Sequence, residues 1–161
     1  MPDMKHILTA VVRNRPGVLA RVVGVISGRG YNIETLNVGP THDPGVSKMT
    51  LVVPGDDHVL EQVLRQLDKL VDVLAVSDVT RRRHINREMI LVEVGTRGGR
   101  RGDLIELTAL FAAQVVGVRE HSITIQMVGD ERAVEDFLRL LAPHAILDLS
   151  RSGAIAVERG E

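Results

Sequence analysis

The sequence predicts an α+β protein made of two units that share one order of elements, β-α-β-β-α-β. Apolar runs typical of strands alternate in this order with patterns in which apolar residues recur at helical spacing, and the whole series occurs twice. A basic polar segment, Arg81 to His84, separates the two series. We therefore expect two ferredoxin-like domains, with residues 1–80 in the first, 81–87 as a linker and 88–161 in the second.

The first predicted helix begins directly after a turn that ends the first strand. Pro16 is tolerated in a first helical turn, because its missing N–H would be unpaired there. Asn14 or Arg15 then lies near the N-cap, and Gly28 ends the helix. One face of this helix is apolar and comprises Val18, Leu19, Val22, Val23 and Ile26.

The remaining elements follow from similar patterns. β-rich apolar runs predict strands at residues 6–12, 32–39, 48–53, 73–79, 89–94, 115–118, 123–128, 145–149 and 154–157. Acidic residues that can cap a helix precede three further helical patterns. These caps are expected at Asp56 or Asp57, at Asp103 and at Asp130.

Composition limits the chemistry that the chain can perform. Its 161 residues contain no cysteine, which excludes disulfides and cysteine-ligated metals. Twenty basic residues nearly balance 21 acidic ones, and aromatic residues make up only 2%, so we expect neither a nucleic-acid nor a membrane partner. The six histidines have no metal spacing, and no catalytic constellation is evident. We expect no catalytic residues, no metal site and a cytoplasmic location.

The stretch from Asn14 to Leu19 indicates a binding site for a small carboxylate. A strand that leads straight into a helix leaves unpaired N–H groups at the helix start, where the helix dipole also favours an anion. Gly17 has no side chain, so a ligand can approach the backbone closely. An ordinary capped helix start is the alternative interpretation of these residues.

Two other segments invite a phosphate-binding interpretation that their sequences do not favour. Residues 98–102, Gly-Gly-Arg-Arg-Gly, resemble a phosphate loop but lack its Gly-Lys-Ser/Thr ending, which favours a flexible loop. Arg81, Arg82 and Arg83 could clamp a phosphate, but a solvated linker that docks on a partner protein fits the charge balance better.

Several stretches together resemble a known family. They are Asn14–Leu19, Gly28–Leu36, Asp43–Pro44, Ser47–Thr50, Leu67–Val73, Arg87–Glu88 and Arg151–Gly153. The first half resembles an ACT domain, the amino-acid-sensing form of the ferredoxin-like fold. Over nearly its full length the chain is similar to the small regulatory subunit of acetolactate synthase, also called acetohydroxyacid synthase.

The resemblance implies a regulatory protein of branched-chain amino acid biosynthesis without a catalytic site or cofactor of its own. Such subunits bind the large catalytic subunit, which is expected to carry thiamine diphosphate, FAD and magnesium. They raise its activity and confer feedback inhibition by valine, or in some members by leucine or isoleucine. Two of their ACT domains pair side by side in a homodimer. A freestanding amino-acid sensor acting on another enzyme or regulator, or a small enzyme on the same scaffold, is the alternative.

The resemblance also implies which residues bind valine. One wall of the site comprises Asn14, Gly17, Val18 and Leu19. The other comprises Asn32 and Ile33 from a second copy of the chain. Helix N–H groups would hold the carboxylate, and the side-chain amides of the two asparagines would bind the ammonium or the carboxylate. The side chains of Val18 and Ile33 suit a short branched ligand.

Overall fold

The structure, a computed structural model, describes residues 4–160, and the chain divides into two compact units. The first unit extends to Ile85 and resumes at Ala154, and the second spans Asn86–Gly153. Each unit contains the element order β-α-β-β-α-β, and each builds an antiparallel sheet with two helices. The predicted α+β class with two ferredoxin-like domains is confirmed.

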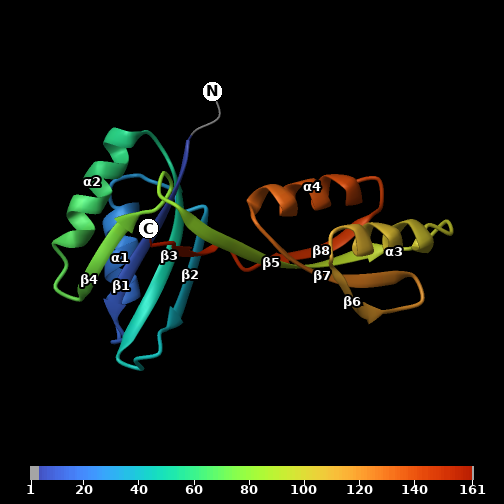
Figure 1. Cartoon of the computed structure of the whole chain (residues 1–161), viewed down its shortest axis with the longest axis horizontal. Helices are drawn as coiled ribbons and strands as arrows, with labels where there is room; N and C mark the ends of the chain where they lie inside the picture. The colour runs from blue at the N-terminus through green and yellow to red at the C-terminus, as the bar shows by residue number, and fades with distance from the viewer. Residues whose placement is uncertain (1–3, 161) are drawn as a thin grey trace. The chain divides into compact units, whose positions relative to one another are not determined.

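The first unit contains six elements around one sheet. They are β1 (Lys5–Arg13), α1 (Val18–Ser27), β2 (Thr35–Pro40), β3 (Val46–Pro54), α2 (Asp57–Asp68) and β4 (Val73–Asp78). The strand order is β2-β3-β1-β4, and all neighbours are antiparallel. Figure 1 shows this order, with β2 and β4 at the two edges of the sheet. The edge strand β2 therefore has one side that pairs with no other strand among residues 4–160.

The core of the first unit is aliphatic and lies between the sheet and its two helices. Alternate residues of β1 and β3 point into it, as the period of two in a strand requires. Its fully buried members from the strands are Leu8, Ala10, Met49 and Leu51, and those from the helices are Val22, Ile26, Val63 and Leu67. Val22 and Ile26 belong to the apolar face that was predicted for the first helix, and α1 and α2 are each positioned by burial of one face.

Two boundaries in the first unit differ from the prediction. Gly17, and neither Asn14 nor Arg15, is the N-cap of α1, and Pro16 lies before the cap and outside the helical turn. Strand β2 starts at Thr35, so Asn32 is not part of it. By contrast, Asp56 caps α2 as one of the two expected candidates, and its side chain accepts a 2.8 Å hydrogen bond from the Val59 N–H.

The second unit repeats the architecture of the first, and one more strand follows it in the chain. Its elements are β5 (His84–Gly95), α3 (Arg101–Leu110), β6 (Gln114–Val118), β7 (Ser122–Gly129), α4 (Glu131–Leu141) and β8 (Ile146–Arg151), followed by β9 (Ile155–Glu158) in the first unit's final segment. The sheet order is β6-β7-β5-β8, and β9 pairs with β5. Strand β5 begins at His84, inside the segment 81–87 that was expected to be a linker. Residues 84–87 are therefore part of a strand.

Burial and capping explain the helices of the second unit. Phe137 on α4 is fully buried, and its ring lies 5.1 Å from that of Phe111 between their centroids. Asp130 caps α4 as predicted and accepts a 2.8 Å hydrogen bond from the Ala133 N–H. The prediction that Asp103 caps α3 is wrong, because the helix starts earlier with Arg100 at the N-cap and Asp103 lies within its first turn.

An ion pair between a buried carboxylate and a partly exposed arginine joins β5 to β8 in the second unit. The Glu88 carboxylate is 5% exposed and accepts hydrogen bonds from Nε and Nη2 of Arg151, at 2.7 and 3.0 Å. Nη1 of Arg151 also bonds Glu135 on α4, at 2.9 Å. The hydrogen bonds to these carboxylates raise the pKa of the Arg151 guanidinium, while burial opposes the rise. Two separate stretches of the family resemblance, at residues 87–88 and 151–153, thus meet in one interaction.

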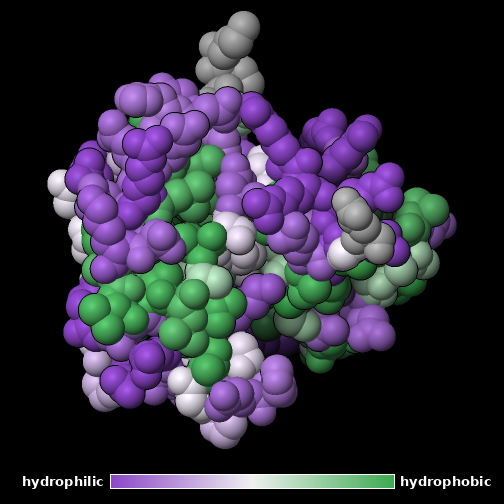
Figure 2. Space-filling model, turned by 60° about the vertical axis from the view of Figure 1, so that its left-hand side comes forward, coloured by the Kyte–Doolittle hydropathy of each residue, from purple (hydrophilic) through white to green (hydrophobic). Residues whose placement is uncertain are grey.

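Apolar side chains also remain at the surface. Among the partly exposed ones are Leu19, Val38 and Leu74 in the first unit and Leu91 and Val116 in the second. Figure 2 shows hydrophobic side chains gathered into continuous green areas between hydrophilic ones. Within residues 4–160, no helix is long and apolar enough to cross a membrane. Clustered apolar surface of this kind is typical of protein–protein contact sites.

Candidate functional site

The turn between β1 and α1 is fastened to the loop that joins β2 to β3. The Asn14 N–H donates to the Gly45 carbonyl at 2.8 Å, and its side-chain Nδ2 donates to the Pro44 carbonyl at 3.0 Å. Asp43 shapes that loop by accepting a hydrogen bond from the Gly45 N–H at 2.8 Å. The Asn14 side chain is therefore oriented, and its Oδ1 and second N–H are left for other partners.

Gly17 allows the chain to enter α1 without a capping side chain. Its φ of +84° lies in the left-handed region that favours glycine, and a Cβ there would meet Arg21 Nη1 at 3.4 Å. No side chain caps α1, and the Val18 N–H reaches only the Arg15 carbonyl, at 3.4 Å. The N–H groups of the first turn are thus available to an acceptor from outside the helix.

The charges around this helix start favour an anion. The first turn of α1 carries no acidic residue, and two exposed arginines precede it: Arg13, the last residue of β1, and Arg15 in the turn. The carboxylate of Asp72 forms an ion pair with Arg21, a residue of α1. Cationic side chains and the positive end of the helix dipole therefore act in the same direction, as a carboxylate ligand would require.

The side chains of the predicted site differ in their accessibility. Val18 is 3% exposed and packs in the core beside Val22, so its backbone and not its side chain lies at the surface of the turn. Its assignment to the ligand site stays a prediction. Leu19 is 44% exposed on the helix surface beside the turn. Asn32 is exposed, and Ile33 is partly buried against the core.

The six predicted residues occupy two separate segments of the first unit. Asn14 to Leu19 form the turn and the first helical residues, whereas Asn32 and Ile33 lie in the loop that enters the edge strand β2. That these segments meet across two copies of the chain stays a prediction. Sequence reasoning missed the part played by Pro44 and Gly45, although their Asp-Pro-Gly sequence marked a turn.

His6 is a titratable side chain of the first unit that packs inside the fold, away from the predicted site. His6 is almost fully buried, with its Nε2 3.1 Å from the Gly55 carbonyl and its ring nitrogens 3.7 and 3.8 Å from the carboxylates of Asp78 and Asp57. It links the start of β1 to the chain just after β3. Over residues 4–160, no group of three or more His, Cys, Asp or Glu side chains is arranged to hold a metal ion.

Two family descriptions match consecutive parts of the chain. Residues 8–75 match a family described as an AHAS small subunit-like ACT domain. Residues 87–160 match a family described as the small subunit of acetolactate synthase. The first match contains both segments of the predicted site, and the second contains the Glu88–Arg151 pair.

Known proteins match over almost the whole chain. The acetolactate synthase small subunit of Aquifex aeolicus is 46% identical over 156 residues, which are 96% of this chain and 81% of that protein. The acetolactate synthase isozyme 3 small subunit of Escherichia coli K12 is 40% identical over 98% of both chains. The crystal structure of the acetolactate synthase small subunit from Thermotoga maritima superposes with a TM-score of 0.88 at 29% identity, covering 98% of this chain and 99% of the other.

Proposed function

This chain belongs to the family of acetolactate synthase small subunits, and on that premise we propose that it is the regulatory subunit of such a synthase. In this role it binds a large catalytic subunit, raises the activity of that subunit and makes it sensitive to valine. Thiamine diphosphate, FAD and magnesium would belong to the catalytic subunit. The observation that carries the proposal is the match over 98% of both chains with the Escherichia coli small subunit.

Valine is the effector that we propose for the α1 start, with leucine or isoleucine as weaker candidates. The uncapped N–H groups after Gly17 suit the ligand carboxylate, and Arg13 and Arg15, which precede the helix, add favourable charge. Hydrogen bonds to charged groups contribute roughly 1.5–3 kcal/mol each. Ile33 would supply apolar contact, but one methylene changes affinity by only about 1–3 kcal/mol, so selectivity among aliphatic amino acids would be modest.

A homodimer would complete the site. The free edge of β2 is suited to pairing with a second copy, and such pairing would extend the sheet. Asn32 and Ile33 directly precede this edge strand, so they lie close to the surface that would pair. Val38, on the same strand, is 42% exposed and offers apolar surface that dimerisation would cover. Each ligand would then contact two copies.

The proposed mechanism of regulation is a change in the dimer. Valine held between two ACT domains would stabilise one arrangement of them, and the catalytic subunit would respond to that arrangement. Coupling between such sites is typically about 1–3 kcal/mol, which corresponds to a change of roughly 5- to 150-fold in affinity. The ligand therefore needs no direct contact with the catalytic subunit to influence it.

Reconstitution tests the proposal. The purified chain is added to the catalytic subunit from the same organism, and acetolactate formation is measured with and without valine. We expect the rate to rise on addition of the chain and valine to lower it again. An unchanged rate and no response to valine would overturn the proposal. Valine binding without any effect on the enzyme would instead indicate a freestanding amino-acid sensor.

A further inference from the structure

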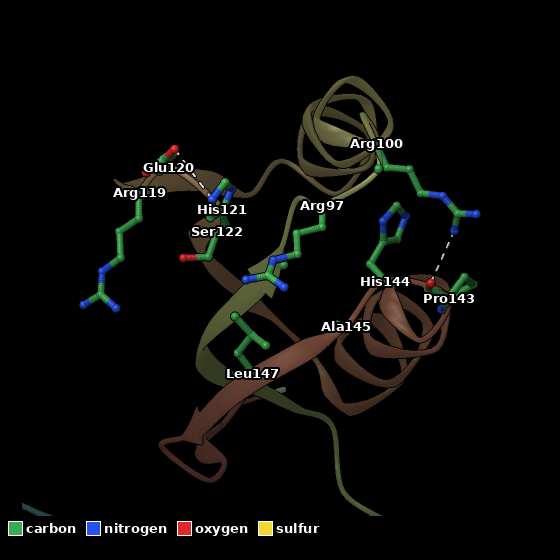
Figure 3. Close-up of a pocket in the computed structure, with 12 residues that line it drawn as sticks. Arg97, Arg100, Arg119, Glu120, His121, Ser122, Pro143, His144, Ala145 and Leu147 are labelled. Carbon is green, nitrogen blue, oxygen red and sulfur yellow. Dashed lines mark hydrogen bonds and ion pairs between the residues drawn. The ribbon is translucent and has the colours of Figure 1, made fainter.

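The second unit contains a pocket of about 780 Å³ that the proposed function does not use. Its walls come from three segments of that unit: the residues after β5, the β6–β7 turn and the chain between α4 and β8. Figure 3 shows Arg97 reaching across the middle of the pocket, with Arg119 on one side and His144 on the other. The glycine-rich segment 98–102, which the sequence alone favoured as a flexible loop, contributes Gly98 to this wall.

The pocket is strongly basic. Arg97, Arg100 and Arg119 line it, and its one carboxylate, Glu120, lies 3.6 Å from His121. Nη1 of Arg119 forms an ion pair with the half-buried carboxylate of Glu93, at 3.2 Å. The Arg97 guanidinium has no hydrogen-bond or ion-pair partner among the residues that the structure describes. Positive charge therefore exceeds the negative charge available to neutralise it, which favours an anionic ligand.

The β6–β7 turn is fixed in position from inside the unit. Nη2 of Arg101 donates to the carbonyls of Arg119 and Glu120, at 3.1 and 3.0 Å. Because these carbonyls are held by the first residue of α3, the Arg119 side chain projects from an ordered segment. A basic group on a fixed backbone loses less entropy on binding than one on a mobile loop.

Two further features point to a ligand in this pocket. The His144 side chain lines the pocket, and its buried Nδ1 has no hydrogen-bond partner among residues 4–160, so a rotation of the ring would let this atom pair with a bound anion. Gly98 and Gly99 both have positive φ, +84° and +77°, and lead into α3, whose N-cap Arg100 makes no side-chain capping bond. The backbone at this rim is therefore open to a close approach.

We propose that this pocket binds the dianionic phosphate group of a small molecule. The Arg97 and Arg119 guanidinium groups suit phosphate because each can donate two parallel hydrogen bonds to its oxygens. Pro143, Ala145 and Leu147 form an apolar wall that suits the organic part of a phosphate ester. The site lies entirely within the second unit and is independent of valine binding.

Calorimetric titration of the full chain with inorganic phosphate tests the proposal, in phosphate-free buffer at constant ionic strength. We expect binding to weaken by about tenfold or more in Arg97→Gln, because a bidentate contact is lost. Arg65→Gln is the matched control, since Arg65 is an exposed arginine of the first unit paired with Glu61 at 3.7 Å. Equal affinity in wild type and Arg97→Gln, or an equal loss in the control, would overturn the proposal.

A second titration separates free phosphate from a phosphate ester. Glycerol 3-phosphate is the probe, and Leu147→Ser is the variant, because it removes part of the apolar wall. Weaker binding of the ester with unchanged binding of inorganic phosphate supports a phosphate ester as the ligand. In wild type, either anion should shift the NMR amide signals of Gly98 and Gly99. Absence of these shifts at saturation would place the anion elsewhere and contradict the assignment.

Discussion

At the scale of single residues, Gly17 determines how α1 begins and what can lie against its start. We expect Gly17→Asp to abolish the response to valine, because its carboxylate would occupy the space proposed for that of the ligand and repel it. Activation of the catalytic subunit should persist, since the core does not include this position. The measurement is acetolactate formation by the reconstituted enzyme over a range of valine concentrations.

Gly17→Asn separates charge from strain in this experiment. Asparagine has nearly the same shape as aspartate and tolerates the left-handed conformation comparably well. We expect valine to inhibit the Asn variant at lower concentration than the Asp variant. Inhibition of the Gly17→Asp enzyme at wild-type valine concentrations would mean that the ligand binds elsewhere.

Asn14 contributes a side chain that is already oriented by the Pro44 carbonyl. We expect Asn14→Ala to weaken valine binding by about tenfold or more, which is the loss of one hydrogen bond to a charged group. The free energy of unfolding of the Asn14→Ala variant should fall by no more than about 1 kcal/mol, because the lost hydrogen bond to the Pro44 carbonyl is exposed and joins uncharged groups. Calorimetric titration with valine and a denaturant melt measure the two effects, and unchanged affinity would exclude Asn14 from the site.

At the scale of elements, the Glu88–Arg151 pair holds β5 against β8. We expect Glu88→Gln to destabilise the second unit by about 2–3 kcal/mol, because it leaves Arg151 partly buried with a weaker partner. Glu135→Gln, at the exposed partner of the same arginine, should cost less than about 1 kcal/mol. Amide hydrogen exchange at Ile90 reports on this sheet directly, and equal effects of the two variants would contradict the account.

The free edge of β2 allows a test of the proposed dimer. The Thr41 N–H bonds the Val46 carbonyl on β3, so by the antiparallel alternation the N–H of Val38 faces away from β3. Val38→Pro should therefore block pairing with a second copy while it leaves the ladder to β3 intact. We expect the Val38→Pro variant to sediment as a monomer, whereas the Val38→Ala variant should remain a dimer. A dimeric Val38→Pro chain would argue against pairing through β2.

Sequence patterns predicted the elements well because burial dominates their formation. On the apolar face predicted for α1, Val18, Val22 and Ile26 are buried in the core, whereas Leu19 stays exposed. Capping was predicted where an aspartate directly precedes the helix, as at Asp56 and Asp130. It failed at Asp103 because an acidic residue is favourable both at the cap and in the first turn, so residue type alone does not distinguish the two positions.

The binding turn was located from sequence, but its geometry was not. A positive φ at Gly17 and the hydrogen bonds from Asn14 to the β2–β3 loop depend on contacts between segments far apart in the chain. Helical periodicity places Val18 and Leu19 on neighbouring positions and does not reveal that only Val18 enters the core. The basic pocket of the second unit was missed because its three wall segments are separate in sequence.

At the scale of the whole molecule, the two units share a fold but carry different surfaces. The first has an uncapped helix start and an edge strand, β2, and the second has a basic pocket and the Glu88–Arg151 ion pair. This division agrees with a proposed regulator that receives an amino-acid signal in one unit and makes other contacts through the second. The central claim is that one valine is bound by two copies of the first unit.

Complementation between two defective variants tests this claim most directly. Gly17→Asp breaks one wall of the site, and Ile33→Asp breaks the other. If each site takes one wall from each copy, a mixed dimer contains one intact site and one doubly broken site.

Equilibrium binding of labelled valine is measured for each variant alone and for the two variants unfolded and refolded together in equal amounts. Each variant alone should bind almost no valine. The mixture should recover about one quarter of the wild-type binding sites, because half of its dimers are mixed and each mixed dimer holds one working site of two. Recovery of this size at wild-type affinity would support a shared site. No recovery in the mixture, with mixed dimers shown to be present by mass spectrometry, would contradict it.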